Sequence, residues 1–285
     1  MNDPHATDSE LELVTFDRPP LSEVGLSVQF APGAVDIDVL AAFTAATRAA
    51  LPRRQHHVPV PPMVETFDDA PRPAPFSIQV QGQLTLPRTW FMSDDQVSLV
   101  QLQPDRLSFN WRRIDGAADY PRYPEIRERL VEYLGILYRC FEEVGSVQPT
   151  VNLCEVAYIN PIELPDAPER WHPDLSRILK RVRPEALQFL PAPEDSQLQE
   201  RYRIAGDDGP IGRLHLSATP VVAGTPPHPL YMVNLAARVR PRGAELEPVC
   251  EALDIGHRWV VLGFTDVTTD EMHKLWGLDD GGETQ

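Results

Sequence analysis

The 285-residue sequence contains only three cysteines, and none of them lies in a metal-binding pattern. Cys140, Cys154 and Cys250 are isolated in apolar surroundings, without a CxxC motif or the paired Cys/His spacing that zinc sites require. We therefore expect buried, reduced thiols, a reducing compartment and no bound metal.

The sequence also lacks a long apolar segment and a targeting signal. Residues 1–12 are polar and acidic, which is the opposite of a secretory signal peptide. No apolar run approaches the roughly 20 residues that a helix needs to cross a bilayer. These two absences predict a cytoplasmic protein that does not enter a membrane.

Positive charge is scarce in this chain. Its 26 basic residues face 42 acidic ones, so the formal net charge is −16 at pH 7. Nucleic acids and anionic membranes both require a basic footprint on the protein, and this field repels them at long range. The charge therefore argues against both as partners, although a local basic patch would override it.

Motifs of common enzyme classes are missing as well. The sequence has no GxSxG, no GxxxxGKS/T, no GxGxxG after a strand and no HExxH. Adjacent acidic pairs such as Asp94-Asp95 and Asp207-Asp208 fall at turns, where they usually serve turn formation and solubility. The sequence thus names no catalytic residue and no cofactor, although carboxylates far apart in the chain can still converge in space.

Proline is abundant, with 30 residues in all, and it is concentrated between the expected elements. The run Pro59-Val60-Pro61-Pro62 lies in a connection over residues 53–75 that has no strong regular pattern. Aromatic and β-branched residues remain plentiful between such runs. This composition predicts rigid connections within a folded protein.

The first half of the chain has the periodicities of a strand, a helix, further strands and a long helix. Alternating apolar residues predict a half-buried strand over residues 23–30, and a helix is expected between Asp36 and Pro52. Apolar residues at helical spacing predict a long helix from Pro124 to Gly145. The short strands expected between the two helices cover residues 76–86, 88–93, 97–103 and 106–113.

The same order recurs from Val151 onwards. A strand over residues 151–164, broken at Asn160-Pro161, is followed by a short helix over residues 174–182. A closing long helix begins near Leu246, and Thr268 with Glu271 three residues later forms a capping box for a last short helix. The strands expected between these helices cover residues 199–204, 213–222 and 229–240.

This repetition predicts an α+β fold made of two fused strand–helix–antiparallel strands–helix pseudo-repeats. Together they would form one curved antiparallel sheet with the helices packed on one face. The topology resembles the saddle of the TATA-box-binding protein, a likeness that carries no inference about DNA binding. The expected segments of this single fused domain are a flexible N-terminal arm (1–18), a first repeat (19–148), a second repeat (149–277) and an acidic tail (278–285).

Several runs of residues are similar to a family of sporadically distributed bacterial proteins, typically of about this size. Their order and spacing match over most of the chain. The runs are Pro19 to Val24, Leu99 to Trp111, Tyr120 to Tyr123, Tyr158 to Ile162, Ala252 to His257, Phe264, and Thr268 to Met272. The resemblance implies a bacterial origin, but this family has no settled function to carry over. It often has a basic residue where Pro161 stands, so an anion contact by that residue would be absent here.

The first candidate binding surface is the polar face of the predicted strands. Gln101 and Gln103 lie on one strand, and Asn110, Arg112 and, at the end, Arg113 lie on the next. Amide and guanidinium groups at alternate positions can read a peptide, a nucleotide or a partner's backbone through directional hydrogen bonds. The alternative is a solvated sheet face whose polar residues pair across strands.

Two further side chains and one arginine pair complete the candidates. Trp111 belongs to the core unless it points outward, in which case it becomes a binding anchor. Arg238 and Arg240 alternate along the last strand and could bind phosphate or an acidic partner, or else pair with the protein's own carboxylates. His257 is expected to be a satisfied, partly buried histidine rather than a catalytic base.

The sequence thus favours a non-enzymatic binding or regulatory protein of bacterial origin. It would use the open sheet face, or the groove between its two halves, to bind a partner protein, a peptide or a small ligand, and a homo-oligomer is left open. An accessory role in a defence or toxin–antitoxin locus is a natural version, since sporadic distribution resembles that of horizontally exchanged genes. The alternative is an enzyme or nucleotide-handling domain built from dispersed Asp, Glu and Arg residues.

Overall fold

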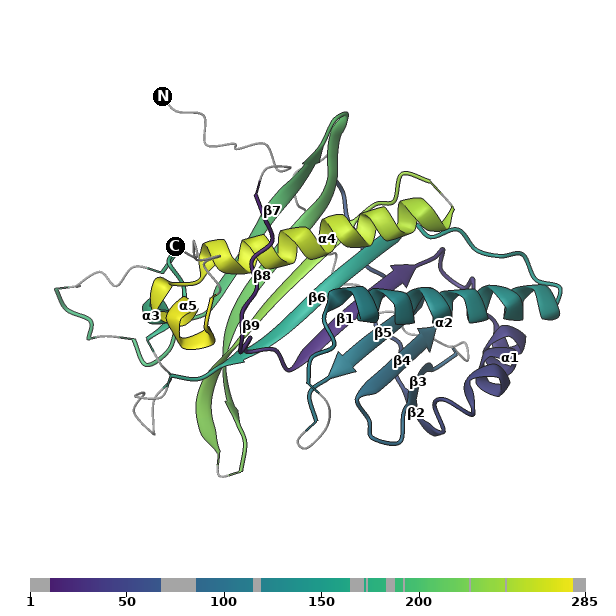
Figure 1. Ribbon diagram of the computed structural model, residues 1–285, viewed down its shortest axis with the longest axis horizontal. Coiled ribbons are helices and arrows are strands. Elements are labelled where there is room, and N and C mark those ends of the chain that lie inside the picture. The colour runs from purple at the N-terminus through teal and green to yellow at the C-terminus, as the bar shows by residue number, and fades with distance from the viewer. Residues whose placement is uncertain are drawn as a thin grey trace, which may run out of the picture.

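A computed structural model of the chain forms the α+β fold that the sequence predicts, with nine strands and five helices among its described residues (Figure 1). Except for Leu86, the strand predicted over residues 76–86 lies outside the described part. Residues 1–10 of the predicted arm and 279–285 of the predicted tail do so too. The structure describes residues 11–67, 86–114, 119–164, 172, 174–182, 188–191, 193–225, 227–243 and 245–278.

The nine strands join in one open antiparallel sheet. They are β1 (Glu23–Gln29), β2 (Arg53–His57), β3 (Arg88–Met92), β4 (Ser98–Gln103), β5 (Arg106–Arg112), β6 (Leu153–Ile162), β7 (Leu198–Gly206), β8 (Gly209–Ala223) and β9 (His228–Val239). Their order is β2-β3-β4-β5-β1-β6-β9-β8-β7. The opening strands of the two halves, β1 and β6, therefore lie side by side within the sheet.

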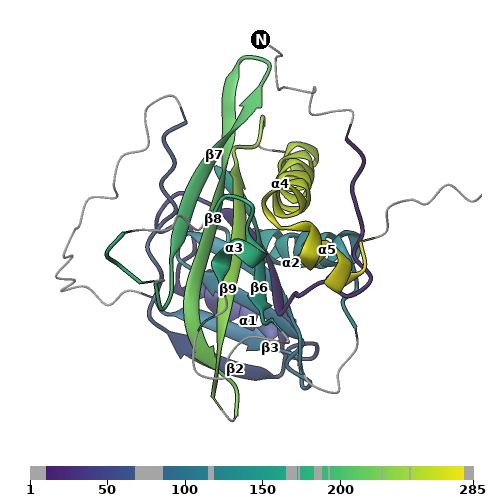
Figure 2. The same cartoon turned by 90° about the vertical axis from the view of Figure 1, so that its left-hand side faces the viewer.

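The helices cover one side of this sheet. They are α1 (Ile37–Thr47), α2 (Tyr123–Glu143), α3 (Leu175–Ile178), α4 (Leu246–Val267) and α5 (Asp270–Trp276). Helix α2 packs against β5 and β1, and α4 packs against β9 and β6. Figure 2 shows both long helices on the same side of the sheet. The main hydrophobic core fills the space between this helical layer and the strands.

Local sequence explains where the early helices begin. Asp36 caps α1, because its carboxylate accepts hydrogen bonds from the backbone N–H groups of Asp38 (3.0 Å) and Val39 (2.9 Å). Pro124 stands in the first turn of α2, where its fixed φ suits a helix and its missing N–H needs no partner. The buried stripe of α2 includes Ile126, Leu130, Leu134 and Leu137.

The last helix begins one residue later than the predicted capping box places it. Thr269 is the N-cap of α5, and its hydroxyl accepts a hydrogen bond from the Met272 N–H (3.4 Å). Thr268 is fully buried at the end of α4 and donates its hydroxyl to the Phe264 carbonyl (2.7 Å). The prediction of Thr268 as the cap is wrong, because that hydroxyl is used to end the preceding helix.

The predicted break at Asn160-Pro161 is also wrong, because β6 continues through both residues. Ile159 lies opposite Glu23, the first residue of β1, so β1 has ended where Pro161 stands. The N–H that Pro161 lacks would therefore point to the side of β6 where no strand is left to accept a hydrogen bond. On the other side β9 remains paired, with Pro161 opposite Met232.

The connection predicted over residues 53–75 begins with a strand. Residues Arg53–His57 form β2, which pairs with β3 at the edge of the sheet, with Gln55 opposite Trp90. Its side chains are polar and largely exposed. A strand without an apolar face has no period-two hydrophobic signal, so the pattern could not reveal it.

Trp111 belongs to the core. Its side chain is buried, and its ring centroid lies 5.2 Å from that of Tyr120. It lies on β5 between Asn110 and Arg112, which face the opposite, polar side of the sheet. The alternative in which Trp111 serves as an exposed binding anchor is therefore excluded.

Candidate functional site

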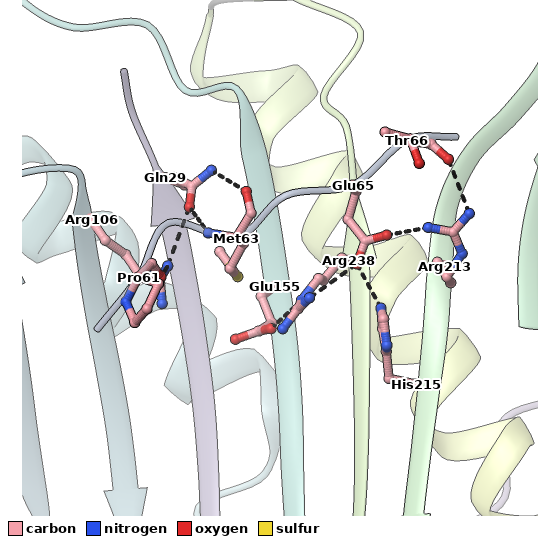
Figure 3. A network of polar contacts seen from close by, with 10 residues as sticks. All are labelled: Gln29, Pro61, Met63, Glu65, Thr66, Arg106, Glu155, Arg213, His215 and Arg238. Carbon is pink, nitrogen blue, oxygen red and sulfur yellow. Dashed lines mark hydrogen bonds and ion pairs between the residues drawn. The ribbon is translucent and has the colours of Figure 1, made fainter. Parts of the chain in front are cut away.

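The polar face of the sheet is covered in part by the proline-rich segment 58–67, which we call the strap (Figure 3). Two glutamines each hold one strap residue by a pair of hydrogen bonds to its backbone. Gln29 donates to the Met63 carbonyl (3.0 Å) and accepts from the Met63 N–H (2.6 Å). Gln103 donates to the Val60 carbonyl (3.0 Å) and accepts from the Val60 N–H (3.2 Å). The face that the sequence leaves open thus binds the protein's own chain.

Glu65 is the charged anchor of the strap, and its side chain is only 4% exposed. Its carboxylate accepts hydrogen bonds from Arg213 and from Arg238 (3.0 Å), and His215 Nε2 lies 2.6 Å away (Figure 3). Burial alone would raise the pKa of Glu65, but the hydrogen bonds and charges of His215 and Arg238 outweigh it and lower the pKa to about 2. The strap is therefore fixed to β8 and β9 by an ionised carboxylate.

The glutamine and asparagine residues singled out in the sequence bond to the protein itself. Gln103 is buried and holds the strap, as described above. Gln101 donates to Asn110 Oδ1 (3.0 Å), and Asn110 donates to Glu23 Oε1 (2.6 Å). These contacts are the cross-strand polar pairs of the alternative interpretation.

The four arginine candidates are spread over the sheet rather than gathered in one place. Arg112 donates twice to the Gln96 carbonyl (3.2 and 2.8 Å), and Arg113 donates to the Pro19 carbonyl (3.4 Å). Arg238 bridges Glu65 and Glu155, while Arg240 lies 4.9 Å from the ring centroid of Phe67 in the strap. Their assignment to partner binding stays a prediction.

A cavity lies on the helical side of the sheet, and we call it the groove pocket. It has a volume of about 430 Å³ and lies between the start of α2, strand β6, helix α4 and residues 13–21. Phe16 lines it from the N-terminal side, and its buried ring packs edge-on against Phe264 (5.9 Å) and Trp276 (5.9 Å). Its other lining residues include Tyr120, Arg122, Tyr123, Tyr158, Asn160, His257, Val260 and Val261.

A chain of polar groups follows one wall of the groove pocket. The hydroxyls of Tyr120 and Tyr158 lie 2.9 Å apart, and the Tyr158 hydroxyl lies 3.0 Å from His257 Nδ1. The ring of Tyr123 stacks on that of His257 at a centroid distance of 3.8 Å. Tyr123 also donates its hydroxyl to Asp254 (2.7 Å), which forms an ion pair with Arg127 (2.6 Å). The expectation of a satisfied, partly buried His257 is confirmed.

The tyrosines and His257 of this wall are uncharged at neutral pH, and burial strengthens that preference. Desolvation is the largest effect on His257 and lowers its pKa to about 4, against a smaller opposing effect of Asp254. Desolvation also raises the pKa of Tyr120, Tyr123 and Tyr158 above that of a free tyrosine. The pocket therefore offers neutral hydrogen-bonding groups among apolar side chains, with the guanidinium of Arg122 as its charged lining group.

We expect His257 to make folding stability depend on pH between about 6.5 and 4. The unfolded chain binds a proton at its ordinary pKa of 6.5, whereas the folded state resists protonation until about pH 4. The stabilising contribution is thus complete above pH 6.5 and is lost as the pH falls towards 4. Urea unfolding across this window should show a loss of about 3 kcal/mol that the His257→Gln variant lacks. Equal pH slopes for both proteins would contradict this assignment.

Arg122, the N-cap residue of α2, has an unusual backbone conformation. Its φ is 73° and its ψ is 158°, a region that residues with a Cβ rarely adopt. Its guanidinium carbon lies 5.8 Å from the ring centroid of Tyr120, and both residues line the groove pocket. Backbone conformations of this kind persist where surrounding structure enforces them, and they are enriched at functional sites.

Most polar residues of the groove pocket were not chosen from the sequence as site residues. Tyr120, Tyr123, Tyr158 and Asn160 have no shared motif or spacing, and they meet only in the folded chain.

Comparison of the chain with protein-family models, with curated proteins and with solved structures found no match. Within the described residues, no group of three or more His, Cys, Asp or Glu side chains is placed to hold a metal ion. None of the described helices combines the length and apolar character that crossing a bilayer requires. The geometry of the strap and of the groove pocket is thus what bears on function.

Proposed function

We propose that this chain is a non-enzymatic binding or regulatory protein that holds an apolar group in the groove pocket. The occupant is a side chain of a partner protein or peptide, or a small ligand. The observation that carries this proposal is the cavity of about 430 Å³ itself, whose lining is mostly apolar and whose polar groups are neutral except for Arg122. Binding sites for small molecules and anchoring side chains usually combine these properties.

The location of the pocket favours the groove between the two halves, rather than the polar face of the sheet, as the binding surface. We further propose that the two halves are pseudo-repeats with the saddle-like topology, each opening with a central strand and closing with a long helix. The central pairing of β1 with β6 supports this, as does the packing of α2 and α4 on the same side. The groove pocket then lies between the two halves, where the sequence places the alternative binding surface.

Binding fits the chemistry of the pocket better than catalysis does. The tyrosines remain protonated, and the Nδ1 atom of His257 is engaged by Tyr158. Asp254, the nearest carboxylate of this network, is held by Tyr123 and Arg127. These groups can orient a ligand through hydrogen bonds, but the tyrosines are not activated nucleophiles and His257 is not a base with a pKa near neutrality.

The test is to fill the groove pocket with a larger side chain. Val261 lines the cavity, so the Val261→Trp variant should weaken binding of a neutral, environment-sensitive naphthylamine dye at least tenfold, by occupying its volume. The matched control is Val147→Trp, because Val147 is 91% exposed and lies away from the pocket. Fluorescence titration measures dye affinity, and thermal unfolding shows whether both variants are folded. Equal dye affinity in all three proteins would contradict the proposal.

A further inference from the structure

A second cavity, of about 150 Å³, lies on the polar face of the sheet beside the strap residue Val60. It is separate from the groove pocket, which lies on the helical side of the sheet. Its walls are polar, and they include Arg88, Arg106, Gln101, Ser27, Ser108 and Glu155. We infer that this cavity binds a small tetrahedral oxyanion, such as phosphate.

Two buried arginine donors lack an acceptor at this place. Nε of Arg88 and Nε of Arg106 are both buried and have no hydrogen-bond partner within the described part of the chain. Arg106 is held in position by the hydrogen bonds of its Nη2 atom to Gln29 (3.2 Å) and to the Pro61 carbonyl (3.1 Å). A buried N–H without an acceptor is costly, so an oxyanion that accepts from both arginines would remove that cost.

Other residues that line the cavity supply further hydrogen-bond donors. The hydroxyls of Ser27 and Ser108 lie 2.8 Å apart, and only one of them can donate its hydrogen to the other. The second hydroxyl hydrogen is therefore left for a ligand. Gln101 uses one amide hydrogen on Asn110 Oδ1 (3.0 Å) and has a second one to offer. Several donors converging on one small space are what an oxyanion requires.

The local charge also favours an anion here. Arg88 and Arg106 line the cavity together with one carboxylate, that of Glu155, which already accepts a hydrogen bond from Arg238 (2.7 Å). Burial is the first cause of a lowered pKa for Arg106, and the nearby positive charges of Arg238 and Arg88 add to it against Glu155 and Asp105. Burial in this cavity therefore disfavours the charged form of Arg106, and an anion bound beside it would favour that form. The net charge of −16 opposes its approach at long range, so we expect modest affinity.

The size of the cavity limits the ligand to one oxyanion group. A volume of about 150 Å³ holds a few water molecules or one phosphate group, but not a whole nucleotide. Free phosphate and the phosphate of a larger molecule share this chemistry. In the second case the remainder of that molecule would lie outside the cavity.

The test is calorimetric titration of the full chain with inorganic phosphate at constant ionic strength. We expect Arg88→Gln to weaken phosphate binding at least tenfold, because it removes a charged donor, and Ser108→Ala to weaken it about threefold. Arg129→Gln is the matched control, because Arg129 lies on α2 and is 54% exposed, and it should bind like the wild type. Equal affinity of wild type, R88Q and S108A would overturn the inference. Absence of binding at about 10 mM phosphate would do so as well.

Two further measurements are needed. One distinguishes free phosphate from the phosphate of a nucleotide, and the other distinguishes this cavity from the groove pocket. Adenosine monophosphate binding more tightly than inorganic phosphate, with the same loss in R88Q, would assign the phosphate of a nucleotide. Equal affinities would assign free phosphate. V261W, which fills the groove pocket, should bind phosphate like the wild type, so failure of the proposed function leaves this inference intact.

Discussion

Replacing Glu65 by alanine should lower the free energy of unfolding by about 3–5 kcal/mol. The variant leaves the buried guanidinium of Arg213, only 6% exposed, without its carboxylate partner, and a buried unpaired charge costs much more than a surface one. It also removes the contacts that join the strap to Arg238 and His215. Urea denaturation of the purified variant gives the change directly.

The matched control is Asp207→Asn, which breaks the pair with Arg242 at a carboxylate that is 87% exposed. An exposed pair contributes at most about 1 kcal/mol, so this variant should unfold almost like the wild type. Similar losses of unfolding free energy in E65A and D207N would show that the buried ion pairs of Glu65 stabilise the fold no more than an exposed pair does.

Glu65 also predicts a response to acid. Its pKa is about 2 in the folded state against an ordinary value of 4.5, so its stabilising contribution is complete above pH 4.5. The contribution is lost as the pH falls from 4.5 towards 2, and the E65A variant should lack that part of the pH dependence. An identical loss of stability below pH 4.5 in the wild type and in E65A would be inconsistent with a buried, ionised Glu65.

The Gly212→Ala variant should be destabilised by about 3 kcal/mol, at the upper end of what overpacking costs. A Cβ atom at this position would lie 2.5 Å from the Arg238 carbonyl oxygen, 3.1 Å from Val239 and 3.2 Å from Ile204. Gly212 lies on β8 with paired strands on both sides, so the backbone cannot move away from one neighbour without approaching another. Urea denaturation measures the effect.

The same substitution at Gly135 is the control, because the nearest atom to its added Cβ would be Arg139 Nη1 at 3.7 Å. Gly135 lies within α2, where alanine is favoured over glycine by about 0.5–1 kcal/mol. We expect G135A to be stabilised and G212A to be destabilised. A neutral G212A variant would mean that β8 and β9 can separate more easily than the register implies.

Period-two and helical patterns predicted most strands and both long helices, because they report which side of an element is buried. Val24, Leu26 and Val28 of β1 are fully buried, as their alternation indicates. The misplaced cap at Thr268 and the supposed break at Pro161 were local errors. Each depended on what lay beside the residue, the end of α4 in one case and the end of β1 in the other.

The strap could not be placed from its own residues. An extended proline-rich segment has no apolar period, and its position depends on Gln29 and Gln103, which lie 34 and 43 residues from their strap partners. The alternation that identified Gln103 and Arg238 as facing away from the helices was informative. Whether solvent, a partner or the chain itself covers them depends on where residues 58–67 run.

The groove pocket shows the same division between local and distant information. His257 was recognised as a satisfied, partly buried side chain, but its neighbour Tyr158 is 99 residues away and Tyr123 comes from the other half of the chain. Composition and periodicity were sufficient for the α+β class, the antiparallel strands and the polar and apolar faces, because each depends on neighbouring residues. The covering of the polar face and the meeting of three tyrosines and a histidine around one cavity depended on the assembled sheet. The pairing of β1 with β6 joins the two halves in one sheet, and the contacts of the strap with β8 and β9 add to it.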